Sequence, residues 1–201
     1  MITRSALKWG AIKAPVANTN KGMVVHYDSA NQRLAEKKCS ACKDYWERTR
    51  TMHMKGNQWI DIGYAYGVCP HGEVYEGRGY GRVQAAAKQT PGKLPSGNDR
   101  WVNVTLMGGP DDPVPSAQID AFLKLRAKLM SEKGMGSDVK CHSDFTATSC
   151  PGNIARALVR NGTFSRISEE VKEKDTVKPG DVWNHEIPVT WGTETDRKAH
   201  V

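Results

Sequence analysis

Runs of β-branched and aromatic residues alternate with helix-like stretches along the chain, and this alternation constrains the fold more than any other feature. The strand-like runs span 23–29, 62–78, 101–108 and 139–145. The helix-like stretches span 41–54, 116–133 and 151–161. A Pro-His-Gly turn divides the second run, which favours a hairpin. The pattern predicts an α/β fold with a mixed central β-sheet flanked by about three helices.

The length of 201 residues fits one domain with an appendage. We expect a domain over 1–165 and a charged linker over 166–181, for which an exposed helix followed by a turn is the alternative. Residues 182–201 form a C-terminal extension that either packs on the core or begins a further module. The Gly- and Pro-containing segment 79–100 is expected to be a long loop, and such loops are often functional.

The positive charge lies in the first four-fifths of the chain. The net charge is +7, and residues 163–201 hold six Lys/Arg against eight Asp/Glu, so 23 basic and 14 acidic residues remain in 1–162. A surplus of nine positive charges indicates an anionic partner, namely nucleic acid, lipid or a bacterial wall polymer. We expect no nucleic acid, because no recognition motif is visible, and no membrane span, because no run of about 18 apolar residues exists.

Two histidines and one cysteine suggest metal chemistry. His26 interrupts an otherwise apolar strand, where it is either hydrogen-bonded in the core or a ligand at the strand end. His142 and Cys150 are eight residues apart, on either side of a turn rich in hydroxyl residues. Cys150 precedes the Pro151 helix, whose dipole is expected to lower the pKa of the thiol. Two imidazoles and a thiolate leave one tetrahedral zinc position open, which is typical of hydrolytic zinc.

Several motifs in order resemble the zinc-dependent N-acetylmuramoyl-L-alanine amidases of the phage endolysin type, which share their fold with peptidoglycan recognition proteins. The matching segments, within about residues 4–160, are Trp9-Gly10-Ala11, VVHYD around His26, His53 through DIGY, GEVYEGRGY at 72–80, and His142 through Cys150-Pro151-Gly152. The resemblance implies one catalytic zinc ion held by His26, His142 and Cys150. It also implies a zinc-hydroxide mechanism that cleaves the amide between N-acetylmuramic acid and L-alanine.

The resemblance also assigns catalytic roles. Tyr64 falls on the family's catalytic tyrosine, and a phenol near the metal can donate a hydrogen bond to the oxyanion that forms at an amide carbonyl. Thr148 occupies a position where phage members often have Lys, so the proton shuttle is left open. His53 is expected to have a structural role or to support a metal ligand rather than to act directly in catalysis, and Asp144 either supports a ligand histidine or lies at the surface.

Three residues are candidates for substrate binding. Tyr27 follows the first ligand, where many relatives have a second His, and either contacts substrate or lines the groove. Arg82 follows the Gly-Arg-Gly-Tyr motif and is expected to favour a diaminopimelate carboxylate over a lysine amine at peptide position three. Asn98 either presents its amide to the substrate or caps the loop.

The other four cysteines are expected to be free thiols. Cys39-x-x-Cys42 resembles a zinc knuckle or a redox pair, but a second zinc needs two more ligands, and only Cys69 and Cys141 remain. His71 is read as a turn residue. Related extracellular proteins have a disulfide near this place with wider spacing. Cys141 is expected to point into the core, opposite His142.

The sequence therefore favours a bacteriolytic peptidoglycan hydrolase of the phage or prophage endolysin type, acting as a monomer on the bacterial cell wall. The alternative is a non-catalytic peptidoglycan-binding receptor of the same fold, in which the ligand cysteine is typically lost. The first fifteen residues lack an apolar signal region, being interrupted by Lys8 and Lys13. We accordingly expect synthesis in the host cytoplasm and action on the wall after release.

Overall fold

The computed structural model describes residues 1–166, and the expected linker and C-terminal extension lie outside the described residues apart from Arg166. Five strands form one sheet in the order β3-β2-β4-β1-β5. The strands are β1 (Gly22–His26), β2 (Tyr66–Val68), β3 (Val74–Glu76), β4 (Val102–Leu106) and β5 (Asp138–Cys141). β2, β4, β1 and β5 are mutually parallel, and β3 is antiparallel to β2. The predicted mixed sheet and the predicted hairpin are both confirmed.

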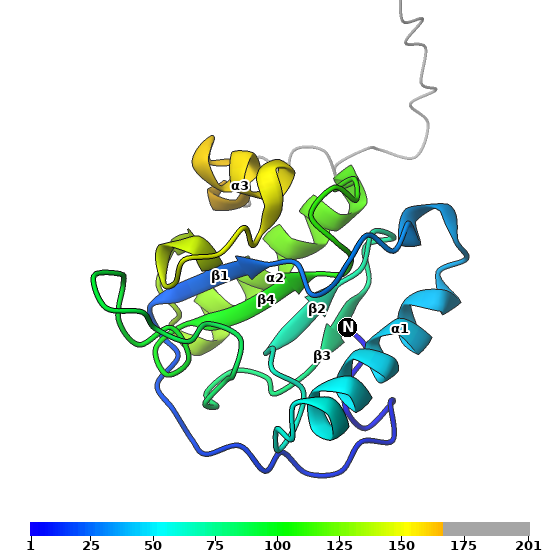
Figure 1. The fold of residues 1–201 in the computed structure, drawn as a ribbon, viewed down its shortest axis with the longest axis horizontal. Helices are drawn as coiled ribbons and strands as arrows, with labels where there is room; N and C mark the ends of the chain where they lie inside the picture. Colours follow the sequence, from blue (N-terminus) through cyan, green and yellow to red (C-terminus); the bar gives the residue numbers. More distant parts are fainter. Residues whose placement is uncertain (167–201) are drawn as a thin grey trace, which may run out of the picture. The chain divides into compact units, whose positions relative to one another are not determined.

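Three α-helices in the described part cover the two faces of the sheet (Figure 1). They are α1 (Ser40–Thr51), α2 (Ser116–Lys133) and α3 (Gly152–Arg160). A five-residue π-helical turn, Met52–Gly56, extends α1. None of the helices in residues 1–166 is both long and apolar enough to span a bilayer. The prediction of about three flanking helices is confirmed.

Strand alternation divides the core between the two faces. On one face, Val25 and Val104 pack with Phe122 of α2 and Val159 of α3. On the other face, α1 contributes Trp46 to a second cluster that includes Tyr64, Tyr75 and Met107. Gly67 of β2 is required under α1, because a Cβ there would lie 2.6 Å from the Trp46 ring. The helix predicted over 41–54 is confirmed by α1 and the π-helical turn that follows it.

The ends of the strands position the candidate ligands. His26 is the last residue of β1, and β1 lies between β4 and β5 in the middle of the parallel part of the sheet. The carboxyl ends of parallel strands are the usual place for ligand sites in α/β folds. β5 ends at Cys141 rather than at Phe145, and the chain turns through a short 3₁₀ helix, His142–Asp144. This early turn brings His142 next to the end of β1.

The segment 79–100 contains neither α-helix nor strand ladder, as predicted for a long loop. It is nevertheless tied to the domain. Arg78, immediately before it, donates hydrogen bonds to the carbonyl groups of Asp61, Ile62 and Val83. Val16 and Arg82 form an isolated antiparallel bridge. The loop is therefore anchored along its first few residues.

Candidate metal centre

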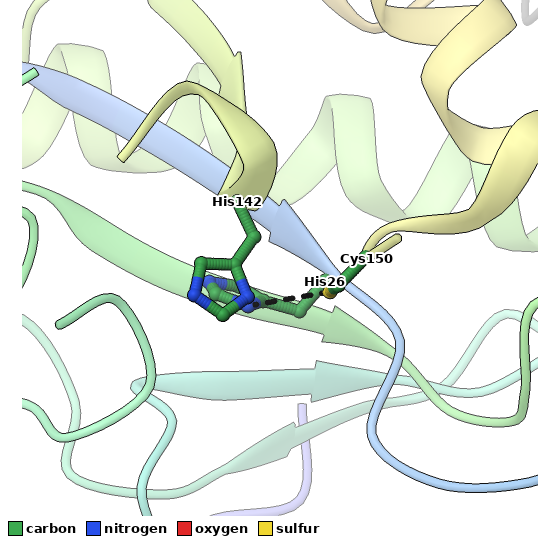
Figure 2. A group of neighbouring side chains, drawn as sticks. All are labelled: His26, His142 and Cys150. Carbon is green, nitrogen blue, oxygen red and sulfur yellow. Dashed lines mark hydrogen bonds between the residues drawn. The ribbon is translucent and has the colours of Figure 1, made fainter. Parts of the chain in front are cut away.

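His26, His142 and Cys150 converge from three separate segments (Figure 2). One donor atom of each lies within 4.8 Å of the others. The two imidazole rings are 4.5 Å apart between centroids, and His26 Nδ1 is 3.7 Å from Cys150 Sγ. His26 and Cys150 are buried, and His142 is half-buried. The structure thus assembles the three predicted ligands into one cluster.

Hydrogen bonds fix the tautomer of His26. The side-chain amide nitrogen of Asn103 donates to the carbonyl groups of Gly97 and Trp101, so its oxygen is left as an acceptor. That oxygen, Oδ1, is 2.7 Å from His26 Nε2, which must therefore carry the proton. His26 Nδ1 consequently has a free lone pair, and this is the atom that faces Cys150. Such an orienting partner is the usual companion of a metal-binding histidine.

Asp144 shapes the segment that carries His142. Its Oδ2 accepts a hydrogen bond of 2.9 Å from the backbone N–H of Cys141, and its Oδ1 pairs with Arg160 of α3. Asp144 therefore fixes the turn around His142 without a recorded contact to the imidazole itself. The side chain of Cys141 is fully buried in the core cluster on the opposite face, as predicted.

Cys150 lies just before α3 and follows a tight turn. Pro151 precedes the helix and is joined to Cys150 by a cis peptide bond, whereas the sequence placed Pro151 inside the first helical turn. Gly152 has a φ of +82°, and a Cβ there would lie 2.6 Å from the carbonyl oxygen of Pro110. Only glycine fits this approach, which holds Cys150 against the end of β1.

The pKa values show neutral imidazoles and a protonated thiol. Burial lowers the pKa of His26 well below its usual value, and the neighbouring His142 acts in the same direction. Burial also lowers the pKa of His142 to about 4. For Cys150 burial raises the pKa to about 12, against the hydrogen bond from the Tyr27 N–H. The expected lowering of the Cys150 pKa is thus wrong, because desolvation outweighs the helix dipole two residues away.

The donor set fits zinc. Neutral imidazoles present lone pairs, and a thiol is deprotonated when a cation coordinates it. One thiolate and two imidazoles are three of the four ligands of tetrahedral catalytic zinc, leaving one position open. The buried Asn103 contact holds one imidazole in its ligand tautomer. The residues present therefore fit the metal that the sequence predicts.

Tyr64 lies beside this cluster. Its ring is 5.4 Å from the His26 ring and 5.6 Å from the His53 ring, and its hydroxyl donates to the Tyr27 carbonyl at 3.4 Å. Burial, with Asp28 and Cys150 nearby, raises the pKa of Tyr64 well above its usual value, so the phenol stays protonated. His53 has the expected structural position, because its Nδ1 accepts a hydrogen bond from the N–H of Gly63, next to Tyr64.

Tyr27 and Thr148 both contact the Cys150 segment. The Tyr27 hydroxyl is 2.9 Å from the Ser149 hydroxyl, and Tyr27 lines a small hollow next to Pro151. Thr148 Oγ1 accepts the backbone N–H of Cys150 at 3.2 Å. Its own O–H therefore remains as a donor.

Arg82 and Asn98 make contacts away from the three ligands. Arg82 donates to the carbonyl of Ala14 at 3.2 Å. The Asn98 side-chain oxygen accepts the N–H of Ala87 at 2.8 Å, which is the loop-capping alternative. The structure does not place either side chain in contact with His26, His142 or Cys150. Their substrate contacts stay predictions.

Two buried polar residues near the candidate metal centre were not identified from the sequence. Asn103 is the one amide in the strand run 101–108, and a buried polar residue between two valines was the available signal. Asp28 accepts a hydrogen bond of 2.6 Å from Tyr45, while its Oδ2 is buried without a partner. Burial raises the pKa of Asp28 to about 7. No sequence pattern distinguished it from a surface carboxylate.

Solved structures share this fold. The Drosophila PGRP-LB wild-type structure matches with a TM-score of 0.65 and 22% identity, covering 78% of this chain and 90% of that chain. The structure of human PGRP-IBETAC in complex with glycosamyl muramyl pentapeptide matches with a TM-score of 0.67 and 19% identity, covering 78% and 92%. The fold and the cluster together define the class: an α/β domain of the peptidoglycan-recognition and amidase type.

Sequence comparison gives the family itself. The N-acetylmuramoyl-L-alanine amidase model matches residues 16–153, and the chain belongs to this family. Peptidoglycan-recognition protein SC2 of Drosophila melanogaster is 27% identical over 155 residues, which are 74% of this chain and 79% of that protein. Peptidoglycan-recognition protein LB of the same species is 30% identical over 148 residues, which are 70% and 61%.

Proposed function

We propose that this protein is a zinc-dependent N-acetylmuramoyl-L-alanine amidase that removes stem peptides from bacterial peptidoglycan. The convergence of His26, His142 and Cys150, with the His26 lone pair turned toward the thiol, is the observation that carries this proposal. A residue set for binding alone has no need of a metal-ligating thiol. Family membership supports the same reaction class.

Zinc at these three ligands would supply Lewis-acid activation of the scissile carbonyl and of water. Tyr64 would exchange its 3.4 Å hydrogen bond to the Tyr27 carbonyl for one to the oxyanion, and its raised pKa keeps that proton in place. Thr148 can orient water or the amide through its free O–H, but it supplies no positive charge. In the overall reaction the C–N bond breaks, the carbonyl carbon gains the oxygen of water, and the amine of L-alanine gains a proton.

The substrate is proposed to be the peptidoglycan of the bacterial wall. A structural neighbour was solved with glycosamyl muramyl pentapeptide, which supports a muramyl peptide as the ligand. The nine surplus positive charges of 1–162 suit an anionic wall and raise encounter rates in a salt-dependent way. Tyr27, Arg82 and Asn98 remain the proposed substrate contacts, with Tyr27 beside the hollow near Pro151.

We place the protein among phage or prophage endolysins, as a bacteriolytic monomer made in the host cytoplasm. Free cysteines support this placement, since all five lie among the described residues and none forms a disulfide. Unpaired thiols in this number are typical of proteins that fold in a reducing compartment. Isolation of the protein from lysing cells, with its cysteines reduced and its mass that of one chain, would agree with this placement.

A non-catalytic peptidoglycan receptor of the same fold is the second candidate, and the similarity to recognition proteins favours it. Digestion of purified sacculi followed by mass spectrometry separates the two. We expect stem peptides with free L-alanine N-termini, lost on chelation and in Cys150→Ala but retained in Cys141→Ala, the matched buried control. Binding without products would support the receptor, and release of D-alanine or of reducing sugar ends would overturn the amidase.

A further inference from the structure

A second cluster of metal-ligating side chains lies where α1 meets the β2–β3 hairpin. It consists of Cys39 and Cys42 at the start of α1, Cys69 directly after β2, and His71 in the hairpin turn. Cys42 and Cys69 are fully buried, and the other two are half-buried. The cluster shares no residue with the His26 centre. From the sequence, Cys69 and Cys141 were the only remaining thiols for a second zinc, and His71 was expected to be a turn residue.

The distances suit a single small ion. One donor atom each of Cys39, Cys69 and His71 lies within 4.8 Å of the others. Cys42 Sγ is 3.4 Å from His71 Nδ1. The thiols of Cys42 and Cys69 also lie close enough to interact with one another. Cys42 lies outside this group of three, so its Sγ must move toward the other donors before all four can surround one zinc ion, where thiolates lie about 3.8 Å from one another.

The tautomer of His71 also supports a metal site at this cluster. Its Nε2 is 2.9 Å from the carbonyl oxygen of Lys37, which can only accept, so Nε2 carries the proton. Nδ1 therefore has its lone pair free, and Nδ1 is the atom that faces the Cys42 thiol. Histidines that bind zinc usually donate the N–H of their other ring nitrogen to a carbonyl group or carboxylate in this way. The arrangement parallels the pairing of His26 with Asn103.

We propose that Cys39, Cys42, Cys69 and His71 bind a second, structural zinc ion. Three cysteines and one histidine with Cys-x-x-Cys spacing form a closed four-ligand set, which is typical of structural rather than catalytic zinc. Burial and the hydrogen bond to Glu73 raise the pKa of Cys39 to about 12, and the hydrogen bond with Cys69 raises the pKa of Cys42, so both thiols are protonated until a cation coordinates them. Binding releases the three thiol protons to solvent, including the one that Cys39 now donates to Glu73.

The ion would join two elements of the second core cluster. α1 and the β2–β3 hairpin contact each other through Trp46 and Tyr75, whose rings are 6.5 Å apart. The bound metal adds its binding free energy to folding, because the unfolded chain has no preformed site. Zinc at this place therefore stabilises the platform on which Tyr64 lies, without taking part in the reaction.

Metal content tests the proposal directly. Full-length protein purified with zinc and freed of excess metal should contain two zinc ions per chain. Cys150→Ala should retain one, Cys69→Ser and His71→Ala should each retain one, and Cys141→Ser, the matched buried control, should retain two. In Cys150→Ala loaded with cobalt, the remaining site should show thiolate charge-transfer absorption that falls when His71→Ala is added.

Thiol accessibility in the wild-type protein tests the proposal even if the Cys69→Ser variant fails to fold. In the wild-type protein, zinc should protect Cys39, Cys42 and Cys69 from alkylation under native conditions, and a chelator should remove that protection and lower the melting temperature of Cys150→Ala. One zinc ion per wild-type chain, lost entirely in Cys150→Ala, would overturn the proposal. So would a Cys39–Cys42 or Cys42–Cys69 disulfide in protein purified without oxidant.

Discussion

The Nε2–H group of His26 donates a hydrogen bond of 2.7 Å to Oδ1 of Asn103 on the adjacent strand β4. Through this bond a fully buried residue decides which nitrogen of the proposed ligand His26 is free. Asn103 is itself fixed by its two bonds to backbone carbonyl groups. The orientation of the His26 ring is therefore set by the sheet rather than by a loop.

Replacing Asn103 should weaken zinc binding at the His26 centre. In Asn103→Ala the Nε2–H group loses its acceptor, so the imidazole is no longer held in its ligand tautomer. We expect zinc affinity to fall by about 10- to 100-fold, measured by competition with a chromogenic chelator. Val104→Ala is the control, because Val104 is buried in the same strand but on the opposite face. Equal losses in both variants would contradict the role given to Asn103.

Tyr64→Phe should impair catalysis and leave the metal in place. The variant keeps the buried ring and removes the proton that is proposed to stabilise the oxyanion. We expect kcat on muramyl peptides to fall by about a hundredfold or more, with KM and zinc content little changed. Steady-state kinetics and metal analysis of the same preparation check this. An unchanged kcat would remove Tyr64 from the mechanism.

Asp61→Asn should destabilise the fold. Asp61 is 1% exposed and binds both Arg4 (2.9 Å) and Arg50 (2.8 Å), which joins the N-terminal segment to α1. Burial alone would raise its pKa, but Arg50, the Ile62 N–H and Arg4 outweigh burial and hold the pKa below its usual value. Breaking a buried ion pair leaves an unpaired charge and costs about 3 kcal/mol. Urea unfolding should show this loss, and the exposed Asp99→Asn should not.

Stability should decrease between about pH 6.5 and pH 4, in part through His53. Burial, followed by the charge of Arg78, lowers the pKa of His53 to about 4, whereas the unfolded chain has its ordinary value of about 6.5. In this interval the unfolded state binds a proton that the folded state does not, so acid favours unfolding. His53→Gln should have a flatter profile of unfolding free energy against pH than the wild type. Parallel profiles would show that His53 does not titrate in this way.

The fold was predictable because its signals are local. Apolar runs marked the strands, and helical spacing placed Tyr45 and Trp46 of α1 on a buried face. The strand signal did not reveal that β5 ends at Cys141, because the 3₁₀ turn after it depends on the contact of Asp144 with the Cys141 N–H. Helical spacing alone would also put Met52 on the buried face, but the chain there passes into a π-helical turn that leaves Met52 exposed.

The candidate site was predictable only where ligand residue types recur in a known order. His26, His142 and Cys150 are brought together as predicted. Asn103 and Asp28 could not be identified, because their roles depend on cross-strand neighbours that no local spacing encodes. The Cys150 pKa was wrong in direction, since sequence shows a nearby helix start but not burial. His71 was not identified as a candidate ligand, because its thiol neighbours lie about 30 residues away or across the hairpin turn.

In the proposed reaction, water cleaves the bond between the lactyl carbonyl of muramic acid and L-alanine. Digestion of sacculi in water labelled with oxygen-18, followed by mass spectrometry, locates the attacked carbonyl. We expect the label in the lactyl carboxylate of the glycan, unlabelled peptides beginning with L-alanine, and no such products from Cys150→Ala. Label in a carboxylate within the stem peptide, or intact sacculi with the zinc-loaded protein, would contradict the proposed reaction.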